Sequence, residues 1–504
     1  MMNKKSFFKS ATYICLIFLL ILFPNFINQV PVSPQGPIYL FAHFLLKSIR
    51  INADSMELYY QFINAAFIAL TIFAVTRFLK TILGWRAALL GVILLSLFPR
   101  FIGASVQNLI DIPFAFFYFF SITQIYSIGI ELPRLKKNRL ILTFLSSVIT
   151  ALIHPAGSLL IFFLLLFLIF STILKFNVKW HKVLDRKKTV LKIASFLGLI
   201  SITIFLSGYL SAHYWYKIPY TNPFQSLSLF NYGHLPFKEI FDSKLIINDQ
   251  LPSLYVVKYL FITTPIVVLI GFFFFLLFLN KMRKNINVFS LLLLLTAFIY
   301  PLIFSIIVPM NGKMAWSLYF MTVPFTVVLS IIGFESLLRA IDDRYVNVVI
   351  SIVLFLLFLS PLRHVIVTAP ATSIYFNEFA GGVTSSYTKY SLDLNTHIPK
   401  IASKWLINHI YDYDIRDFKD HDTVLVLTDA RIDCKNYFTE TPFIQVKQGT
   451  YEQFLQGEGV YFISFPDALD PILLKTKQWP PKEAVYSVYI EDAPVVSFIK
   501  SPMK

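Results

Sequence analysis

Acidic side chains are scarce in the first 360 residues, which hold 11 of the 28 Asp and Glu residues of the 504-residue chain. A carboxylate inside or beside a membrane is costly and usually has a function. Asp111 lies in a short turn between two apolar runs, and Pro113 suits the first turn of a following helix. The Asp111 carboxylate can act as a base or metal ligand, or it can cap that helix by accepting backbone N–H groups. These two roles are compatible, and Asp111 is the leading candidate catalytic residue.

Two more carboxylates, Asp54 and Glu57, precede an apolar segment and share one face if they are helical. They are candidates for a base and a metal ligand, or for a solvated helix start. Arg100 is near Asp111 in the sequence, and an arginine can bind a phosphate through two parallel hydrogen bonds. It can equally pair with Asp111 or with lipid headgroups. Asn108, in the same turn as Asp111, is a candidate substrate-binding residue together with Arg100.

His154 ends an apolar run directly before Pro155, where it can carry a proton or simply pack in the interior. It is the third candidate substrate-binding residue. The chain contains no HExxH or GxSxG motif, no metal-spaced set of Cys and His, and no glycine-rich phosphate loop. A divalent metal ion therefore stays open as a cofactor, without a motif that specifies it.

The elements that must position these residues are membrane helices. The chain is 56% hydrophobic and only 14% charged, whereas soluble domains carry about 25% charged residues, and this excludes a soluble globular protein. A span needs about 20 mostly apolar residues. We expect about eleven spans, near residues 7–26, 58–79, 85–99, 113–130, 140–154, 156–175, 190–209, 257–279, 288–309, 319–337 and 346–360.

Lys and Arg gather at alternate span ends, which places the N-terminus inside by the positive-inside rule. The net charge of +16 is then mostly cytoplasmic anchoring rather than a nucleic-acid surface. An odd number of spans puts the tail outside. The Phe-, Ile- and Lys-rich composition favours a bacterial inner membrane with a periplasmic tail. We predict a multi-span domain over residues 1–360 and a periplasmic domain over 361–504.

The tail reads as a small α/β domain. Apolar residues at helical spacing predict a helix over 398–410. Short apolar runs predict strands over 423–427, 460–465, 485–490 and 495–499, and Glu491-Asp492 suits a hairpin turn between the last two. The predicted fold class is thus a polytopic α-helical membrane protein with a small C-terminal α/β domain.

Three stretches resemble a group of bacterial members of the C-type glycosyltransferase superfamily, namely protein mannosyltransferases and aminoarabinose lipid A transferases. They are Phe98-Pro-Arg-Phe-Ile-Gly103 with Gln107-Asn108-Leu-Ile-Asp111-Ile-Pro113-Phe-Ala115, then Ser373-Ile-Tyr-Phe-Asn-Glu-Phe-Ala-Gly381-Gly382, and Trp479-Pro-Pro-Lys482 through residue 500. The resemblance runs from about residue 60 to the C-terminus.

This resemblance implies an enzyme that moves a sugar from a polyprenyl-phosphate carrier to a lipid, glycan or protein acceptor at the outer face of the membrane. Asp111 matches the second of two acids that the family uses. The first acid is expected soon after the first span, but residues 25–36 contain none. Asp54 and Glu57 are the only first-loop acids that could replace it, so we place both beside Asp111 as candidates. The alternatives are a non-catalytic scaffold that binds a lipid carrier or a partner, and a transporter or polymerase of lipid-linked glycans.

Overall fold

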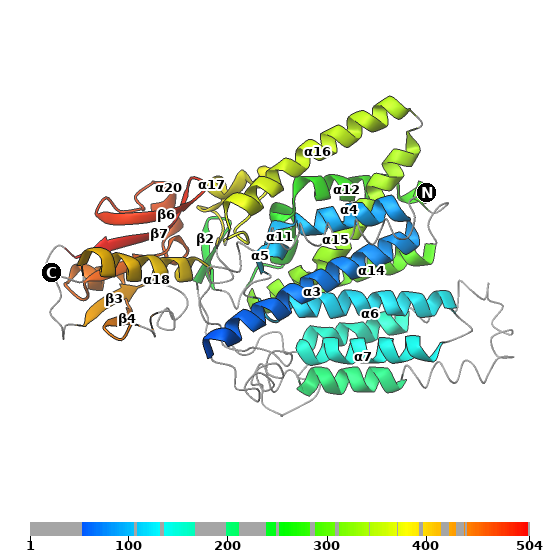
Figure 1. Cartoon of the computed structure of the whole chain (residues 1–504), viewed down its shortest axis with the longest axis horizontal. Coiled ribbons are helices and arrows are strands. Elements are labelled where there is room, and N and C mark those ends of the chain that lie inside the picture. Colours follow the sequence, from blue (N-terminus) through cyan, green and yellow to red (C-terminus); the bar gives the residue numbers. More distant parts are fainter. Residues whose placement is uncertain are drawn as a thin grey trace.

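The computed structural model contains a helical bundle and a small mixed sheet (Figure 1). It describes residues 53–104, 108–131, 136–166, 198–210, 238–247, 251–282, 288–307, 312–341, 343–369, 371–392, 397–414, 423–429, 438 and 441–501. The predicted first span, residues 7–26, lies outside this part of the chain. Within some of these elements a few side chains are also outside the description.

Helices form most of the described part of every predicted span from residue 58 onward. They are α3 (Ala53–Ile82), α4 (Trp85–Ser96), α5 (Pro99–Gly103), α6 (Asp111–Glu131), α7 (Lys137–Ile153), Pro155–Leu166 beginning with the 3-10 helix η2 (Pro155–Ser158), Gly198–Leu210, α11 (Tyr255–Thr263), α12 (Ile266–Leu277), α13 (Leu279–Met282), α14 (Val288–Ile307), α15 (Gly312–Ala340) and α16 (Arg344–Val367). Among the described residues, four helices are long and apolar enough to cross a membrane, or five if α11 and α12 form one span. The predicted number of eleven spans and their orientation therefore stay predictions.

Prolines divide two segments that the sequence predicted as continuous helices. The predicted span 257–279 is wrong in this respect, because α11 ends before Pro265 and α12 continues at an angle of 114°. A proline lacks the N–H that would continue the helix and disfavours helical geometry in the residue before it. The predicted span 85–99 likewise ends early at Ser96, and Pro99 begins the separate helix α5.

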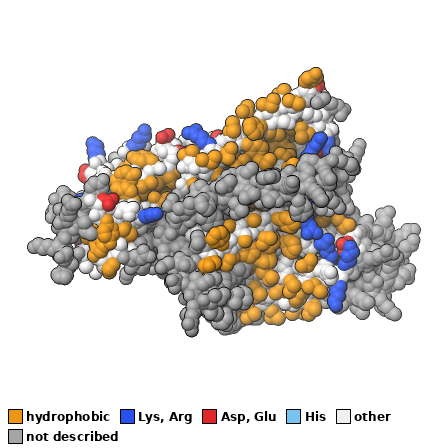
Figure 2. All heavy atoms as spheres, viewed as in Figure 1, with side chains coloured by type: hydrophobic (Ala, Val, Ile, Leu, Met, Phe, Trp, Pro, Cys, Tyr) orange, Lys and Arg blue, Asp and Glu red, His pale blue; other side chains and the backbone are white. Residues whose placement is uncertain are grey.

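Helix α15 is the centre of the bundle, and its apolar stretch is fully buried. It packs tightly against α12 where two glycines meet. A Cβ atom added at Gly333 would lie 1.9 Å from the carbonyl oxygen of Gly271. Helix α16, in contrast to the buried α15, projects from the bundle, and most of its apolar side chains are exposed (Figures 1 and 2). That exposed surface suits contact with lipid.

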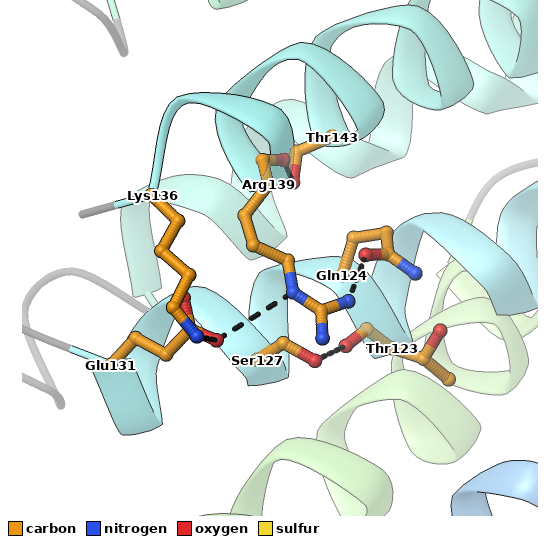
Figure 3. Close-up of polar contacts among 7 residues, drawn as sticks. All are labelled: Thr123, Gln124, Ser127, Glu131, Lys136, Arg139 and Thr143. Atoms are coloured by element: carbon orange, nitrogen blue, oxygen red, sulfur yellow. Dashed lines mark hydrogen bonds and ion pairs between the residues drawn. The ribbon is translucent and has the colours of Figure 1, made fainter.

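Polar contacts join α6 to α7 at one end of the bundle (Figure 3). Arg139 donates a 3.0 Å hydrogen bond to Gln124 and lies 3.6 Å from the Glu131 carboxylate, which also pairs with Lys136 at 3.4 Å. Glu131 thus lies among basic residues, as expected for an acid at a predicted cytoplasmic span end.

The tail sheet follows the predicted α/β pattern. It has the order β4-β3-β5-β7-β6, with β3 (Val424–Thr428) parallel to β4 (Ile444–Gln448) and β5 (Tyr461–Ser464). Strand β7 (Ala493–Lys500) is antiparallel to β5 and to β6 (Ala484–Ile490), and Glu491-Asp492 forms the predicted turn. Helix α18 (His397–His409) confirms the predicted helix. Strand β4 was not predicted.

Helices cover both faces of this sheet. Trp405 of α18 lies with its ring centroid 4.3 Å from that of Phe498 on β7. The next residue, Ile499, points to the opposite face and packs with Phe454 of α19 (Tyr451–Leu455), because successive strand residues alternate between faces. Smaller elements complete the tail: η4 (Glu378–Ala380), α17 (Gly382–Ser386), η5 (Ile410–Asp414), η7 (Pro466–Ala468) and α20 (Pro471–Lys475).

The tail lies at the end of the bundle where α3 and α6 begin (Figure 1). An unpredicted hairpin of β1 (Lys238–Phe241) and β2 (Lys244–Ile247) links the two parts. Ile240 exchanges two 2.8 Å hydrogen bonds with Ser391, which follows α17. On the other side, His364 near the end of α16 lies 3.2 Å from the carboxylate of Glu491 in the β6–β7 turn. The hydrogen bond from His364 holds the pKa of Glu491 below its ordinary value.

Candidate functional site

Asp111 begins α6, and its side chain is only 6% exposed. The carboxylate accepts a 2.6 Å hydrogen bond from the side-chain amide of Asn108 and a short one from the hydroxyl of Ser317 on α15. The Asn108 side-chain oxygen accepts the backbone N–H of Asp111 at 2.8 Å. Asn108 therefore caps the start of α6, which leaves the Asp111 carboxylate to interact across the bundle.

Arg100 lies on α5 and is 2% exposed. Its Nε donates a 3.2 Å hydrogen bond to the carbonyl oxygen of Tyr375. Three aromatic rings surround the guanidinium carbon: Phe376 at 4.9 Å, Trp316 at 5.2 Å and Tyr259 at 5.6 Å to the ring centroids. Cation–π contacts of this kind stabilise a buried positive charge without neutralising it.

The stretch after α16 holds Arg100 in place. Gly103, at the end of α5, packs so closely on this stretch that an added Cβ would lie 2.2 Å from the backbone nitrogen of Ser373. Asn377, which is fully buried, donates hydrogen bonds of 2.7 and 2.9 Å to the carbonyls of Phe261 and Thr264 at the break between α11 and α12. Two of the stretches that carry the family resemblance, 98–115 and 373–382, thus meet in space.

Burial and repulsion by neighbouring carboxylates, chiefly Glu378, raise the pKa of Tyr375 well above its ordinary value. Tyr375 is therefore a neutral hydroxyl over the physiological pH range, and it adds no charge beside Arg100.

Two consecutive residues of α15 contact Arg100 and Asp111, one residue each. The Trp316 ring lies against Arg100, and the hydroxyl of Ser317 binds Asp111. Trp316 and Asn108 are only half-buried, so they form the accessible part of the group. We call Arg100, Asn108, Asp111, Trp316 and Ser317 the α5–α15 site. It combines a cation that can hold a phosphate with a carboxylate that can accept a proton.

Of the remaining predicted residues, the structure describes the side chain of His154 but not those of Asp54 and Glu57. The backbone of Asp54 and Glu57 lies in the first turns of α3, but their side chains are outside the described residues, so their relation to Asp111 stays a prediction. His154 is fully buried, with its ring 4.9 Å from that of Phe114. Its Nδ1 accepts a 3.2 Å hydrogen bond from the backbone N–H of Ala156, and this contact fits the packing role that the sequence left open.

Within the described part of the chain, no three His, Cys, Asp or Glu side chains form a group that could hold a metal ion. The α5–α15 site offers a single carboxylate, that of Asp111. A divalent ion prefers several oxygen ligands, so a metal ion at this site would need ligands beyond the described side chains, and the cofactor stays a prediction.

Glu239, on β1, and the aromatic residues that surround the site were not predicted from the sequence. Glu239 is 1% exposed and shares a hydrogen bond with Tyr255 of α11. A signal for its strand was present, because Asp242 and Ser243 separate two apolar-polar runs. Both have positive φ, 54° and 58°, as in the two-residue turns that favour β-hairpins.

No protein-family model matches the chain, and no curated protein matches it. Among solved structures, the chain is similar to ArnT from Cupriavidus metallidurans in the apo state, with 11% identity, 97% of this chain and 98% of that chain covered, and a TM-score of 0.42. It is similar to the same protein bound to undecaprenyl phosphate, with 11% identity, 97% of each chain covered and a TM-score of 0.43. The similarity extends over nearly the whole length of both chains at low identity.

Proposed function

We propose that this protein is a membrane glycosyltransferase that moves a sugar from a polyprenyl-phosphate carrier to an acceptor at the outer membrane face. The observation that carries the proposal is the α5–α15 site, where a buried cation and a buried carboxylate are held by adjacent residues of one helix. The site lies at the end of the bundle that faces the tail. By the positive-inside rule this end is outside, in the periplasm of a bacterial cell.

Each charged group has a separate task in such a transfer. When the bond between the sugar and its phosphate breaks, negative charge grows on the leaving phosphate. Arg100 is suited to bind that phosphate, because a buried guanidinium stabilises developing negative charge more strongly than an exposed one. Asp111 is suited to accept the proton of the acceptor hydroxyl or amine. The hydrogen bonds from Asn108 and Ser317 orient its two oxygens.

The test separates these two tasks. In full-length protein in detergent or liposomes, Arg100→Gln is expected to weaken binding of undecaprenyl phosphate by at least about tenfold. Asp111→Asn keeps an oxygen that can accept the Ser317 hydroxyl, so it should leave binding nearly unchanged. It should abolish transfer of a labelled sugar from its polyprenyl phosphate to envelope lipids or glycans.

Lys258→Gln is the matched control for Arg100. Lys258 also lies over two aromatic rings, those of Phe241 and Tyr390, but its side chain is 35% exposed and lies outside the α5–α15 site, beside the carboxylate of Asp242. This variant should bind and transfer like the wild type. Normal transfer by Asp111→Asn would contradict the proposed base. Binding without transfer by the wild type, across a panel of polyprenyl-phosphate sugars, would favour a non-catalytic scaffold.

A further inference from the structure

Glu239 is a buried acid that the proposed reaction has not used. It is the second residue of β1 and is 1% exposed, whereas the side chain of Asp242 in the same hairpin is 44% exposed. Burial of a carboxylate is costly unless hydrogen bonds compensate for the loss of water. The position of Glu239 therefore needs a specific partner.

That partner leads to the α5–α15 site. The hydroxyl of Tyr255 on α11 accepts a 3.3 Å hydrogen bond from Nε1 of Trp316 and shares a hydrogen bond with Glu239. A tryptophan Nε1 can only donate, and an ionised carboxylate can only accept. Tyr255 therefore donates its own proton to the ionised Glu239 carboxylate. The sequence of contacts runs from Glu239 through Tyr255 to Trp316, whose ring lies against Arg100.

The aromatic rings along this path also contact one another. The centroids of Tyr255 and Tyr259 are 4.7 Å apart, and those of Tyr259 and Trp316 are 5.0 Å apart. Both Tyr259 and Trp316 lie against Arg100. A rotation of Trp316 would therefore disturb two of the three rings that hold the guanidinium.

The strand that carries Glu239 is fixed from the side of the tail. Side chains alternate along a strand, so Glu239 and Phe241 face α11 while Ile240 faces the opposite way. Ile240 packs in a cluster with Leu474 and Trp479 of the tail. The tail thus helps to fix the strand that presents Glu239 to Tyr255.

We propose that Glu239 is a positioning residue for the α5–α15 site: it orients Tyr255, which orients Trp316 and so sets the place where Arg100 receives a phosphate. This inference rests on the proposed function. It also gives the tail a role, since the tail supports the strand on which Glu239 lies.

Binding of radiolabelled undecaprenyl phosphate to the full-length protein in detergent tests the inference. Glu239→Leu removes the acceptor of the Tyr255 proton and is expected to weaken binding about tenfold, the change that one hydrogen bond typically causes. Glu239→Gln keeps a side-chain oxygen that accepts the same proton, so it should bind within about twofold of the wild type. Tyr255→Phe removes only the hydroxyl and carries the test if Glu239→Leu does not fold.

Two further combinations separate a positioning role from a loss of general stability. The double variant Glu239→Leu/Tyr255→Phe should bind no more weakly than either single variant, because both act through one path. In an Arg100→Gln background, Glu239→Leu should have no further effect on binding. Asp242→Asn, which changes an acid in the turn of the same hairpin, is the matched control and should bind like the wild type.

The outcomes distinguish this inference from the proposed function. Suppose that the wild type binds undecaprenyl phosphate and that Glu239→Leu and Tyr255→Phe both bind it as tightly as the wild type. The positioning role is then wrong, and the proposed function stands. The same holds if Glu239→Leu weakens binding to the same extent in the Arg100→Gln background. A wild-type protein that does not bind undecaprenyl phosphate overturns the proposed function, and the positioning role with it.

Discussion

Asn377 offers the sharpest test of how the site is held together. Its side-chain amide donates to the carbonyls of Phe261 and Thr264, and its side-chain oxygen accepts the backbone N–H of Ala380 at 3.1 Å. The two carbonyl acceptors and the one N–H donor determine which end of the Asn377 side-chain amide carries the nitrogen. Asn377→Asp keeps the size of the side chain and the bond from Ala380, but it replaces the donor group with an oxygen.

The cost follows from these contacts. The carbonyls of Phe261 and Thr264 lose their donor, and each loss lowers the free energy of unfolding by about 1–3 kcal/mol. The new carboxylate also faces these two carbonyl oxygens. We expect the variant to lose roughly 3–5 kcal/mol of stability in total. Because Tyr375 lies two residues before Asn377 and binds Arg100, binding of undecaprenyl phosphate should weaken as well.

Thermal unfolding in detergent, followed by tryptophan fluorescence, measures the effect. Asn347→Asp is the matched control, because the Asn347 side chain on α16 donates a single 3.0 Å hydrogen bond to the carbonyl of Ile341. It should lose only about 1 kcal/mol. Lowering the pH should partly restore Asn377→Asp, since a protonated carboxyl group can donate to one carbonyl. Equal unfolding temperatures of the two variants, or no recovery in acid, would refute the reasoning.

Two further predictions concern the bundle and the tail. Gly333→Ala should push α12 away from α15, because the added Cβ would lie 1.9 Å from the carbonyl oxygen of Gly271. We expect this variant to lose about 1–3 kcal/mol of stability in the same thermal unfolding assay. Gly198→Ala is the control and should keep its stability, because nothing lies within 4 Å of its added Cβ. Burial raises the pKa of Asp429 from 3.8 to about 7, so the folded tail holds a proton there that the unfolded chain releases. The free energy of unfolding should therefore fall as the pH rises between these two values, by up to about 1.4 kcal/mol per pH unit. Asp429→Asn should flatten this pH dependence in unfolding curves recorded across the same range. An unchanged slope in the variant would contradict the prediction.

Local patterns predicted much of the architecture. Helix positions follow from apolar runs that are long enough to cross a bilayer, and the tail strands follow from short apolar runs bounded by turns. Strand β4 was missed, because Ile444–Gln448 has only two apolar residues, whereas the predicted strands were all short apolar runs. The break at Pro265 was missed because the longer segments on both sides of it are mostly apolar, and hydropathy alone does not register a change in helix direction.

The candidate site was predicted in part. Asp111 and Arg100 were identified from their residue types beside apolar spans, and the structure brings them to one end of the bundle. The side chains of Asp54 and Glu57 are outside the described residues, so their part in catalysis stays a prediction. Glu239 was not predicted as a site residue, because no motif surrounds it. Its partner Tyr255 is 16 residues away in the chain, and no local spacing indicates that contact.

The sequence by itself determined that this is an apolar, carboxylate-poor helical protein with an α/β tail, because hydrophobic run lengths and charge placement are local properties. Only the tertiary structure decided which polar groups meet. Arg100 contacts Tyr375 across 275 residues, and Ser317 contacts Asp111 across 206. Such pairs depend on how helices pack against each other, and the packing is set by side-chain shapes along whole interfaces rather than by any short pattern.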